Sequence, residues 1–381
     1  MKAARKFLFI PLSSPGYVFP AIRLAHLLQE RGHEVRFVTA VEHVQLLGCY
    51  GIQAFGVRND RVPFLDPSQW FKPDNARDEA RVLRGIVDQY RPEVIVTSPL
   101  VLGAFAVAAE VGVPLVNLGF TEYLYPGPDG QDAHKRWRLD SITDYYNAYL
   151  AALGRPPVPA GPAESPLLGD RYLLRSVVEL SDARHLPEKV RYVGALYWEP
   201  AYVNVPLRRF LDEARARRSP IVYVQIGRLF DDHALWTGLL RALSQIDASY
   251  VIDLGRADYM RGPQAFPPAS FVSPFVPLGA IADDVRVVLC SGQSTTVLSA
   301  LVHGKPILAI PHAADAHELA HRLEAKGLAL GIHGKEALTP AALAAHLDRL
   351  LGGEQEAAIH RFRALFAAVD DETIVDAATP G

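Results

Sequence analysis

Short apolar segments with strand character alternate with segments of helical spacing at the start of the chain, and this alternation limits the possible folds most. Residues 7–11 are apolar, residues 20–31 repeat apolar side chains at helical spacing, and residues 34–39 form the next apolar segment. Gly32 lies beside basic residues, which is typical of a helix C-terminus. The order strand, helix, strand predicts a βαβ unit, in which the strands are parallel and the helix covers one face of the sheet.

The same alternation continues along the chain and predicts two α/β domains. The first series adds two strands, at 94–97 and 114–118, and two helices, at 100–111 and 132–153. A second series of strands follows a charged stretch at 208–218, with members at 220–227, 250–254, 271–272, 285–290 and 306–310. A chain of 381 residues suits two domains. We place them at 1–205 and 206–381, with the last helix a candidate to pack back on the first domain.

Charge and cysteine content exclude several classes of protein. The chain has 39 Lys and Arg against 42 Asp and Glu, a net charge of −3, which argues against a dedicated nucleic-acid binder. Its two cysteines exclude a disulfide scaffold and a Cys-rich zinc site. No window reaches about 18 uninterrupted apolar residues, so we expect no membrane-spanning segment and a cytoplasmic location. A homodimer is compatible with the sequence.

Ligands of doubly wound sheets bind beyond the carboxyl ends of the strands. The turn 291–296 follows a predicted strand and opens a helix at Val297, so its backbone N–H groups and the helix dipole suit a phosphate. Ordinary capping by Ser or Thr is the alternative. Gly227 and Arg228 form a second candidate phosphate turn. The sequence lacks G-x-x-x-x-G-K-[ST] and lacks G-x-G-x-x-G after the first strand, which disfavours NTP hydrolysis and NAD chemistry.

Two further groups of residues have both a structural and a functional interpretation. His312 and His317 flank Asp315, but this spacing in a loop is a weak metal signal, and we expect no metal ion. The helical segment 132–153 carries four aromatic residues near helical spacing, which either pack in the core or line a small-molecule pocket: Trp137, Tyr145, Tyr146 and Tyr149.

Motifs along nearly the whole chain resemble the GT-B glycosyltransferases of the UDP-glycosyltransferase superfamily, especially the bacterial enzymes that glycosylate natural products. Residues 15–21, 24–25 and 31–35 resemble the N-terminal segment of these enzymes. The donor-binding signature is similar to 291–301, 304–306 and 311–315. Phe275-Val276-Pro277 resembles the family's aromatic-Val-Pro turn against the nucleotide base.

The resemblance implies two Rossmann-like domains that face a cleft, the first binding the acceptor and the second a nucleotide diphosphate-sugar of the UDP or TDP type. It implies a metal-independent, inverting hexosyl transfer to a small aromatic or polyketide-like acceptor, without a further cofactor. It places Tyr17 and Ser98 at the catalytic positions and Phe275 and Val276 against the base. His312 and Asp315 would bind the sugar. The donor phosphates would lie against Gly227, Arg228, Ser291, Gly292, Gln293, Ser294, Thr295 and Thr296, and the acceptor against Glu122, Tyr145 and Tyr146.

The chain departs from the family at the catalytic dyad and in the donor motif. Tyr17 stands where the family has its His base, and Ser98 where it has the Asp that orients this His. Gln293, Ser299 and Ala316 replace a Gly, a Glu and a Gln. An unperturbed Tyr titrates near 10 and is a poor base, so we expect Tyr17 to position the acceptor.

Either the acceptor is itself acidic, or another residue such as Glu122 or Asp231 accepts its proton. Two other functions stay open. One is a catalytically degenerate GT-B protein that acts as an auxiliary or ligand-binding partner. The other is a GT-B enzyme of different chemistry, such as a sugar-phosphate epimerase.

Overall fold

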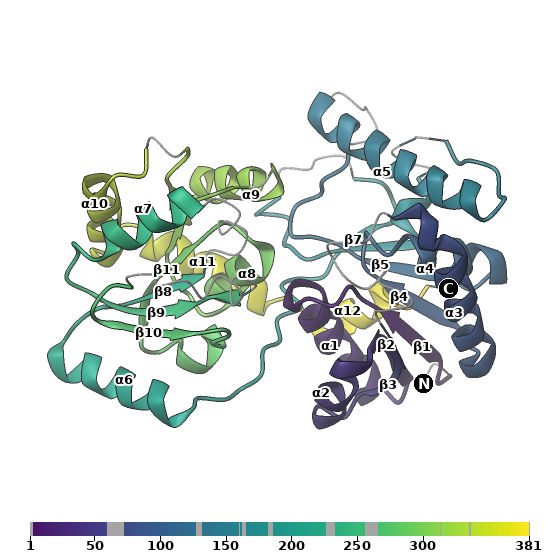
Figure 1. Ribbon diagram of the computed structural model, residues 1–381, viewed down its shortest axis with the longest axis horizontal. Coiled ribbons are helices and arrows are strands. Elements are labelled where there is room, and N and C mark those ends of the chain that lie inside the picture. Colours follow the sequence, from purple (N-terminus) through teal and green to yellow (C-terminus); the bar gives the residue numbers. More distant parts are fainter. Residues whose placement is uncertain are drawn as a thin grey trace. The chain divides into compact units, whose positions relative to one another are not determined.

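The structure is a computed structural model, and it divides the chain into two compact units. It describes residues 3–58, 72–126, 132–159, 161, 165–181, 186–225, 233–255, 266–312, 314–334 and 337–380. The first unit consists of 1–198 together with 369–381, and the second of 199–368. Figure 1 shows both with their element labels.

The first unit is built on a seven-stranded parallel sheet in the order β3-β2-β1-β4-β5-β6-β7. Its strands are β1 (Lys6–Ile10), β2 (Glu34–Ala40), β3 (Gln53–Val57), β4 (Val94–Thr97), β5 (Leu115–Leu118), β6 (Arg171–Leu174) and β7 (Val190–Tyr192). Its α-helices are α1 (Pro15–Glu30), α2 (Val44–Cys49), α3 (Ala76–Tyr90), α4 (Leu102–Val111), α5 (Ala133–Ala152) and α12 (Asp371–Ala377).

Alternate residues of each strand pack under helices on opposite faces of this sheet. Phe7 and Phe9 of β1 belong to a core with residues of α1, α2 and α12. Leu8 and Ile10 belong to a second core with residues of α3, α4 and α5. Because both faces are buried, the strands are continuously apolar, as is usual in parallel sheets. This explains why the short apolar runs of the sequence located β1, β4 and β5.

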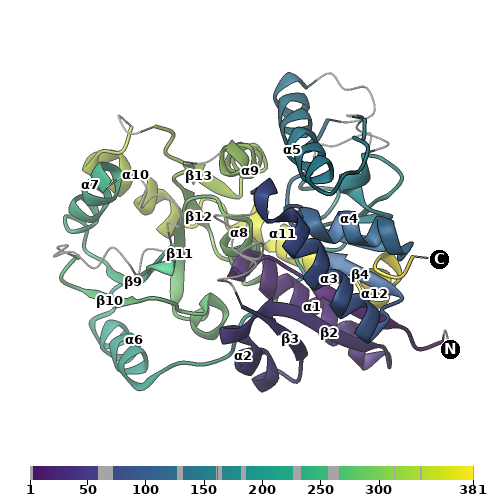
Figure 2. The same ribbon diagram turned by 45° about the vertical axis from the view of Figure 1, so that its right-hand side comes forward.

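The second unit is built on a six-stranded parallel sheet in the order β10-β9-β8-β11-β12-β13. Its strands are β8 (Ile221–Gln225), β9 (Ser249–Asp253), β10 (Ser270–Ser273), β11 (Val285–Cys290), β12 (Ile307–Ala309) and β13 (Ala329–Gly331). Its α-helices are α6 (Val205–Arg217), α7 (His233–Leu243), α8 (Ser294–Val302), α9 (Ala314–Ala325), α10 (Pro340–Leu351) and α11 (Glu356–Ala367). α7 and α10 lie side by side and share a core with β8, β9 and β11 (Figure 2).

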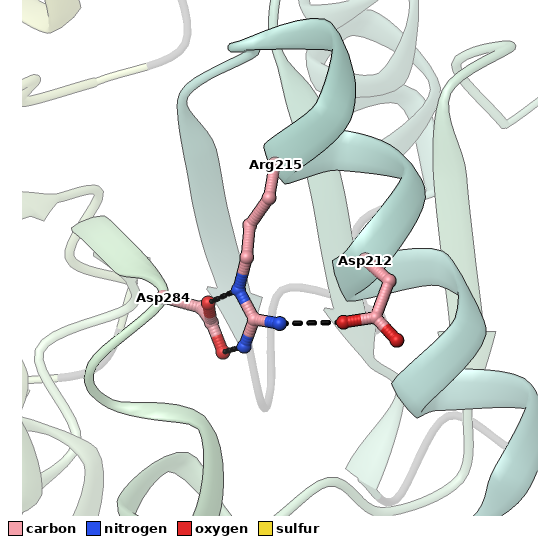
Figure 3. A network of polar contacts seen from close by, with 3 residues as sticks. All are labelled: Asp212, Arg215 and Asp284. Atoms are coloured by element: carbon pink, nitrogen blue, oxygen red, sulfur yellow. Dashed lines mark hydrogen bonds and ion pairs between the residues drawn. The ribbon is translucent and has the colours of Figure 1, made fainter.

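The charged stretch 208–218, which the sequence suggested as part of a boundary region, lies almost entirely in helix α6. One of its charges, Arg215, holds this helix to the residue before β11. The Arg215 guanidinium donates to both carboxylate oxygens of Asp284, at 2.5 and 2.7 Å, and to Asp212 on its own helix (Figure 3). Because Arg215 is solvent-exposed, this pairing orients the helix more than it stabilises the unit.

The chain changes from one unit to the other between two consecutive residues. The ring of Trp198 packs edge-on against Phe19 and Tyr50 of the first unit, whereas the Glu199 carboxylate accepts a hydrogen bond from the Gly279 N–H of the second. The predicted boundary after residue 205 therefore lies later than the observed one, because the irregular segment before α6 carries side chains that already belong to the second unit.

The C-terminal segment is part of the first unit. Asp371 pairs with Arg23 of α1 at 2.8 Å, and the Arg5 guanidinium donates to the Pro380 carbonyl at 2.6 Å. Ile374 and Val375 of α12 are buried in the core that α1 shares. Within the described part of the chain, no helix has both the length and the apolar composition needed to cross a bilayer.

Truncation of Ile374 should therefore destabilise the first unit. Ile374→Ala removes a buried side chain from the core under α1 and is expected to lower its free energy of unfolding by about 2–4 kcal/mol. Guanidinium unfolding followed by circular dichroism measures this, with the exposed Glu372→Ala as the matched control on the same helix. Equal midpoints for the two variants would show that α12 is not docked.

Candidate functional site

The predicted phosphate turn follows β11 in the second unit, but it is shorter than expected: 291–293 join β11 to α8, and 294–296 form the first turn of that helix. Gly292 has φ +77°, and a Cβ there would approach the Ala316 carbonyl oxygen to 2.9 Å, so the turn requires glycine. Gln293 is the N-cap residue of α8, and its side chain makes no capping bond. The capping alternative is therefore not realised at this helix start.

The hydroxyl groups of this segment differ in their partners. Thr296 Oγ1 donates to Gln225 Oε1 at 2.6 Å, which ties α8 to the carboxyl end of β8. Ser291 Oγ and Ser299 Oγ are buried and, among the described residues, have no hydrogen-bond partner. Ser294 and Thr295 are half-buried. The second candidate phosphate turn, Gly227 and Arg228, lies outside the described residues, as does Asp231.

A buried carboxyl group that sequence reasoning missed holds the predicted base-binding turn. Asp253 ends β9; its Oδ1 accepts from the Gly255 N–H at 2.8 Å, and its Oδ2 accepts from the Val276 N–H at 3.3 Å. The Tyr223 hydroxyl lies 2.9 Å from both Asp253 Oδ2 and the Val276 carbonyl. In the sequence, this role of Asp253 is signalled only by its being the one charged residue in the apolar run 250–254.

Burial raises the pKa of Asp253 to about 7, although hydrogen bonds from Tyr223, Val276 and Gly255 oppose this shift. A protonated Asp253 can donate to the Tyr223 oxygen, which frees the Tyr223 proton for the Val276 carbonyl. The buried Val276 is thus held through both backbone groups, while Phe275 beside it is half-buried, with its ring centroid 6.5 Å from that of Tyr202.

The predicted sugar-binding residues lie at the start of α9. His312 is half-buried shortly after β12, and Asp315 is exposed in the first turn of the helix. Further along, His321 and Glu324 of α9 lie beside His333, which follows β13. Their ligand atoms all lie within 4.8 Å of one another, the one such group of three or more metal-binding side chains in the described chain.

In the first unit, the predicted catalytic residues Tyr17 and Ser98 have different contacts. Tyr17 lies in the first turn of α1, half-buried, with its ring edge-on to Phe120 at 6.1 Å. Ser98 is buried after β4, and its Oγ accepts from the Leu12 N–H at 3.4 Å. Ser98 thus supports the loop between β1 and α1.

The predicted acceptor residues have different environments. Glu122 is buried in the segment after β5. Tyr146 lies in the core with its ring 6.3 Å from Phe105, which favours core packing for this side chain. Tyr145 beside it on α5 is 40% exposed.

A group of buried polar residues around Tyr17 was not predicted. Tyr123, Tyr125 and Tyr172 pack edge-on against one another, with ring centroids 5.7–6.4 Å apart. Arg175, directly after β6, is 3% exposed, and its charge interacts with Tyr17 and Tyr172. No motif in the sequence singles out these tyrosines or Arg175.

The raised pKa of Asp253 predicts a pH-dependent stability. The folded chain keeps this proton up to about pH 7, whereas the unfolded chain releases it near pH 4. The contribution of Asp253 to the free energy of unfolding should therefore be largest below about pH 4 and fall as the pH rises toward 7, by up to about 4 kcal/mol.

Asp253→Asn removes the titrating group. The difference in unfolding free energy between wild type and variant, measured in urea at about pH 5 and about pH 8, should change by about 2–3 kcal/mol, because part of the total loss falls below pH 5. The exposed Asp348→Asn is the control and should show no such change. A pH-independent difference for Asp253→Asn would contradict the buried, protonated state.

Comparison with known proteins supplies relatives over most of the chain, although no protein-family model matches it. The PGL/p-HBAD biosynthesis glycosyltransferase of Mycobacterium tuberculosis is 28% identical over 198 residues, which cover 52% of this chain and less than half, 44%, of that protein. The L-demethylnoviosyl transferase of Streptomyces niveus is 26% identical and the 4'-demethylrebeccamycin synthase of Lentzea aerocolonigenes 24% identical. These two alignments cover 86% and 84% of this chain and 85% of each relative.

Solved structures share the architecture of both units. The glycotransferase of kitacinnamycin matches with a TM-score of 0.76 at 20% identity over 98% of this chain and 97% of its own. The spinosyn rhamnosyltransferase SpnG, complexed with thymidine diphosphate, matches with a TM-score of 0.68 at 17% identity over 95% and 96%. The two parallel sheets thus form a GT-B fold, and the chain is similar in sequence to transferases of bacterial natural-product pathways.

Proposed function

We propose that the protein is a glycosyltransferase that moves a sugar from a nucleotide diphosphate-sugar, of the UDP or TDP type, to a small natural-product-like acceptor. The observation that carries the proposal is the start of α8. Its N-cap side chain makes no capping bond, and it lies at the carboxyl end of β11, where doubly wound sheets bind their ligands. A relative in fold was solved with thymidine diphosphate.

The second unit would bind the donor. The N–H groups at the start of α8 and the Ser291 hydroxyl suit the diphosphate, and Gly292 allows the backbone to approach it closely. Arg228 after β8 would add a positive charge. The Phe275-Val276 turn, fixed by Asp253, would lie against the base. The Asp315 carboxylate can accept two hydrogen bonds from sugar hydroxyls.

The first unit would bind an aromatic or polyketide-like acceptor near Tyr17 and Glu122. In an inverting transfer, the acceptor oxygen attacks the anomeric carbon while the bond from that carbon to the diphosphate oxygen breaks. The electron pair leaves with the diphosphate, whose growing charge the helix start stabilises without a metal ion. The acceptor proton ends in solvent.

Tyr17 is assigned a positioning role in this reaction. An ordinary phenol is protonated near neutral pH, and the neighbouring position at the end of β4 holds a serine that is engaged with Leu12. A degenerate auxiliary protein is not favoured, because the relatives matched over most of the chain are named as a synthase and a transferase.

Thermal stabilisation by nucleotide and an Asp315 variant together test whether the second unit binds a nucleotide diphosphate-sugar. dTDP or UDP at a hundredfold excess over its Kd should stabilise the protein by about 2.7 kcal/mol in thermal unfolding. Asp315→Ala should keep this protection and lower kcat/KM for transfer about 10- to 100-fold, because the lost hydrogen bonds go to the sugar. Asp348→Ala, an exposed carboxylate on α10, is the control. Equal loss of nucleotide affinity and transfer in Asp315→Ala would refute the sugar-binding role.

A further inference from the structure

Arg175 is a buried positive charge at the carboxyl end of β6. It is 3% exposed, its Nε donates to the Gly119 carbonyl at 2.8 Å, and its backbone N–H donates to the Phe120 carbonyl at 2.9 Å. These bonds fix the guanidinium beside the segment that follows β5. Within the described residues no carboxylate pairs with it, and the groups that interact with its charge are the hydroxyls of Tyr17 and Tyr172.

Several buried hydroxyl groups lie on β6 and on the segment after β5, the two parts of the chain that Arg175 joins. The hydroxyls of Tyr123 and Tyr125 and of the neighbouring Thr121 are buried and, in the described part of the chain, have no hydrogen-bond partner. Burial raises the pKa of Tyr123, Tyr125 and Tyr172, so all three are neutral donors at physiological pH. The arrangement depends on Gly119, where a Cβ would lie 2.2 Å from the Tyr172 ring.

A buried cation without a counter-charge is costly, and the cost is relieved when an anion binds beside it. Burial lowers the pKa of Arg175 to about 10, so the guanidinium is still charged at neutral pH. The hydroxyls of Tyr17 and Tyr172, which interact with its charge, can donate to the same anion. Charge and donors together fit an oxyanion better than a neutral alcohol.

We propose that the first unit binds an acidic acceptor, a phenol or a carboxylic acid, and that Arg175 holds its ionised oxygen. This inference rests on the proposed function and names its substrate class. The acceptor loses its proton to solvent on binding. Its oxygen then attacks the anomeric carbon, and the sugar–phosphate bond breaks, so that the products are glycoside, nucleoside diphosphate and one proton.

This assignment explains how the chain can lack a His-Asp dyad. A base is needed when the acceptor is a neutral alcohol, but a phenolate or carboxylate brings an ionised nucleophile. The guanidinium lowers the nucleophilicity of that oxygen to some degree while it raises the fraction that is ionised. Arg175 therefore acts as a binding and ionising group, and Tyr17 positions the acceptor.

Binding of 4-nitrophenol tests the inference without any turnover, because its phenolate absorbs visible light and its phenol does not. The full chain should keep the bound dye ionised to a lower pH than the free dye, and should bind benzoate at least about tenfold more tightly than benzamide. Arg175→Met should abolish both effects, and Arg175→Lys should retain part of them. Arg171→Met, at the exposed start of the same strand, should behave as wild type.

Three outcomes overturn the inference. They are equal affinity of the wild type for benzoate and benzamide, an unshifted dye, and an unchanged shift in folded Arg175→Met. If Arg175→Met does not fold, Arg175→Gln and Arg175→Lys replace it. Transfer to aliphatic alcohols as fast as to phenols would refute the acidic acceptor but leave the glycosyltransferase standing. Dye binding that depends on Arg175, in a protein that transfers no sugar, would refute the glycosyltransferase but leave the anion site at Arg175 standing.

An independent group of side chains in the second unit has the chemistry of a metal site. His321 and Glu324 are three residues apart on α9, and His333 approaches from the end of β13. Glu324 Oε2 lies 2.7 Å from His333 Nε2 and 3.6 Å from His321 Nδ1, and the two imidazole rings stack with centroids 4.3 Å apart. A Cβ at Gly331 would lie 2.5 Å from both Glu324 Oε1 and His333 Nε2, so glycine leaves room for this approach.

The geometry points to binding of a divalent cation of the zinc type by His321, Glu324 and His333. Zinc prefers imidazole nitrogen and carboxylate oxygen at about 2.0–2.2 Å, so the stacked rings of His321 and His333 must rotate to point both nitrogens at one ion. His317, one turn before His321 with its ring 6.3 Å from that of His333, is placed to add a fourth ligand.

Competition with a chromophoric zinc chelator, on protein without a histidine tag, tests this site. Wild type should bind one Zn²⁺ per chain, and His333→Ala and Glu324→Gln should each weaken binding at least about tenfold. Gly331→Ala should do the same while every ligand is kept. His346→Ala, on α10, is the control and should bind as wild type. Equal affinity in all variants, or no zinc bound by wild type, would refute the site.

Discussion

In both units, the strands of a parallel sheet send successive side chains to two buried faces, and the rest of the structure depends on this constraint. Phe7 and Phe9 face one core while Leu8 and Ile10 face the other, so nothing within β1 can contact a ligand. Polar groups can be used only where the strands end. Tyr17, Ser98, Arg175, Asp253 and the start of α8 all lie at such ends.

Two buried ionisable residues at strand ends, Asp253 and Arg175, have very different hydrogen-bond partners. Asp253 has three hydrogen-bond donors around it and a pKa raised to about 7, so it is neutral over part of the physiological range and fixes a turn. Arg175 stays charged and, among the described residues, donates one side-chain bond, to the Gly119 carbonyl. The protein itself thus supplies the hydrogen-bond partners of the Asp253 carboxyl group. The Arg175 guanidinium gains a counter-charge only when an anionic ligand binds.

The sequence predicted the fold class because parallel strands are continuous apolar runs, and 94–97 and 285–290 coincide with β4 and β11. It missed β3, β6, β7 and β13, which are three to five residues long, and it described α6 only as a charged stretch. The turn 291–296 could be predicted as a unit because strand, turn and helix are adjacent in the chain. Arg175 could not, because its importance comes from Gly119 and Tyr172, which only the order of β5 and β6 in the sheet brings to it.

The central claim is that this protein transfers a sugar from a nucleotide diphosphate donor. A mass-spectrometric screen of UDP- and TDP-sugars with a phenolic acceptor tests it most directly, because donor, product and released nucleotide are measured together. We expect a product heavier by one sugar residue and an equal amount of nucleoside diphosphate, from at least one donor. Protein that binds the nucleotide but forms neither product nor free diphosphate, with any donor and either a phenol or an alcohol, would contradict it.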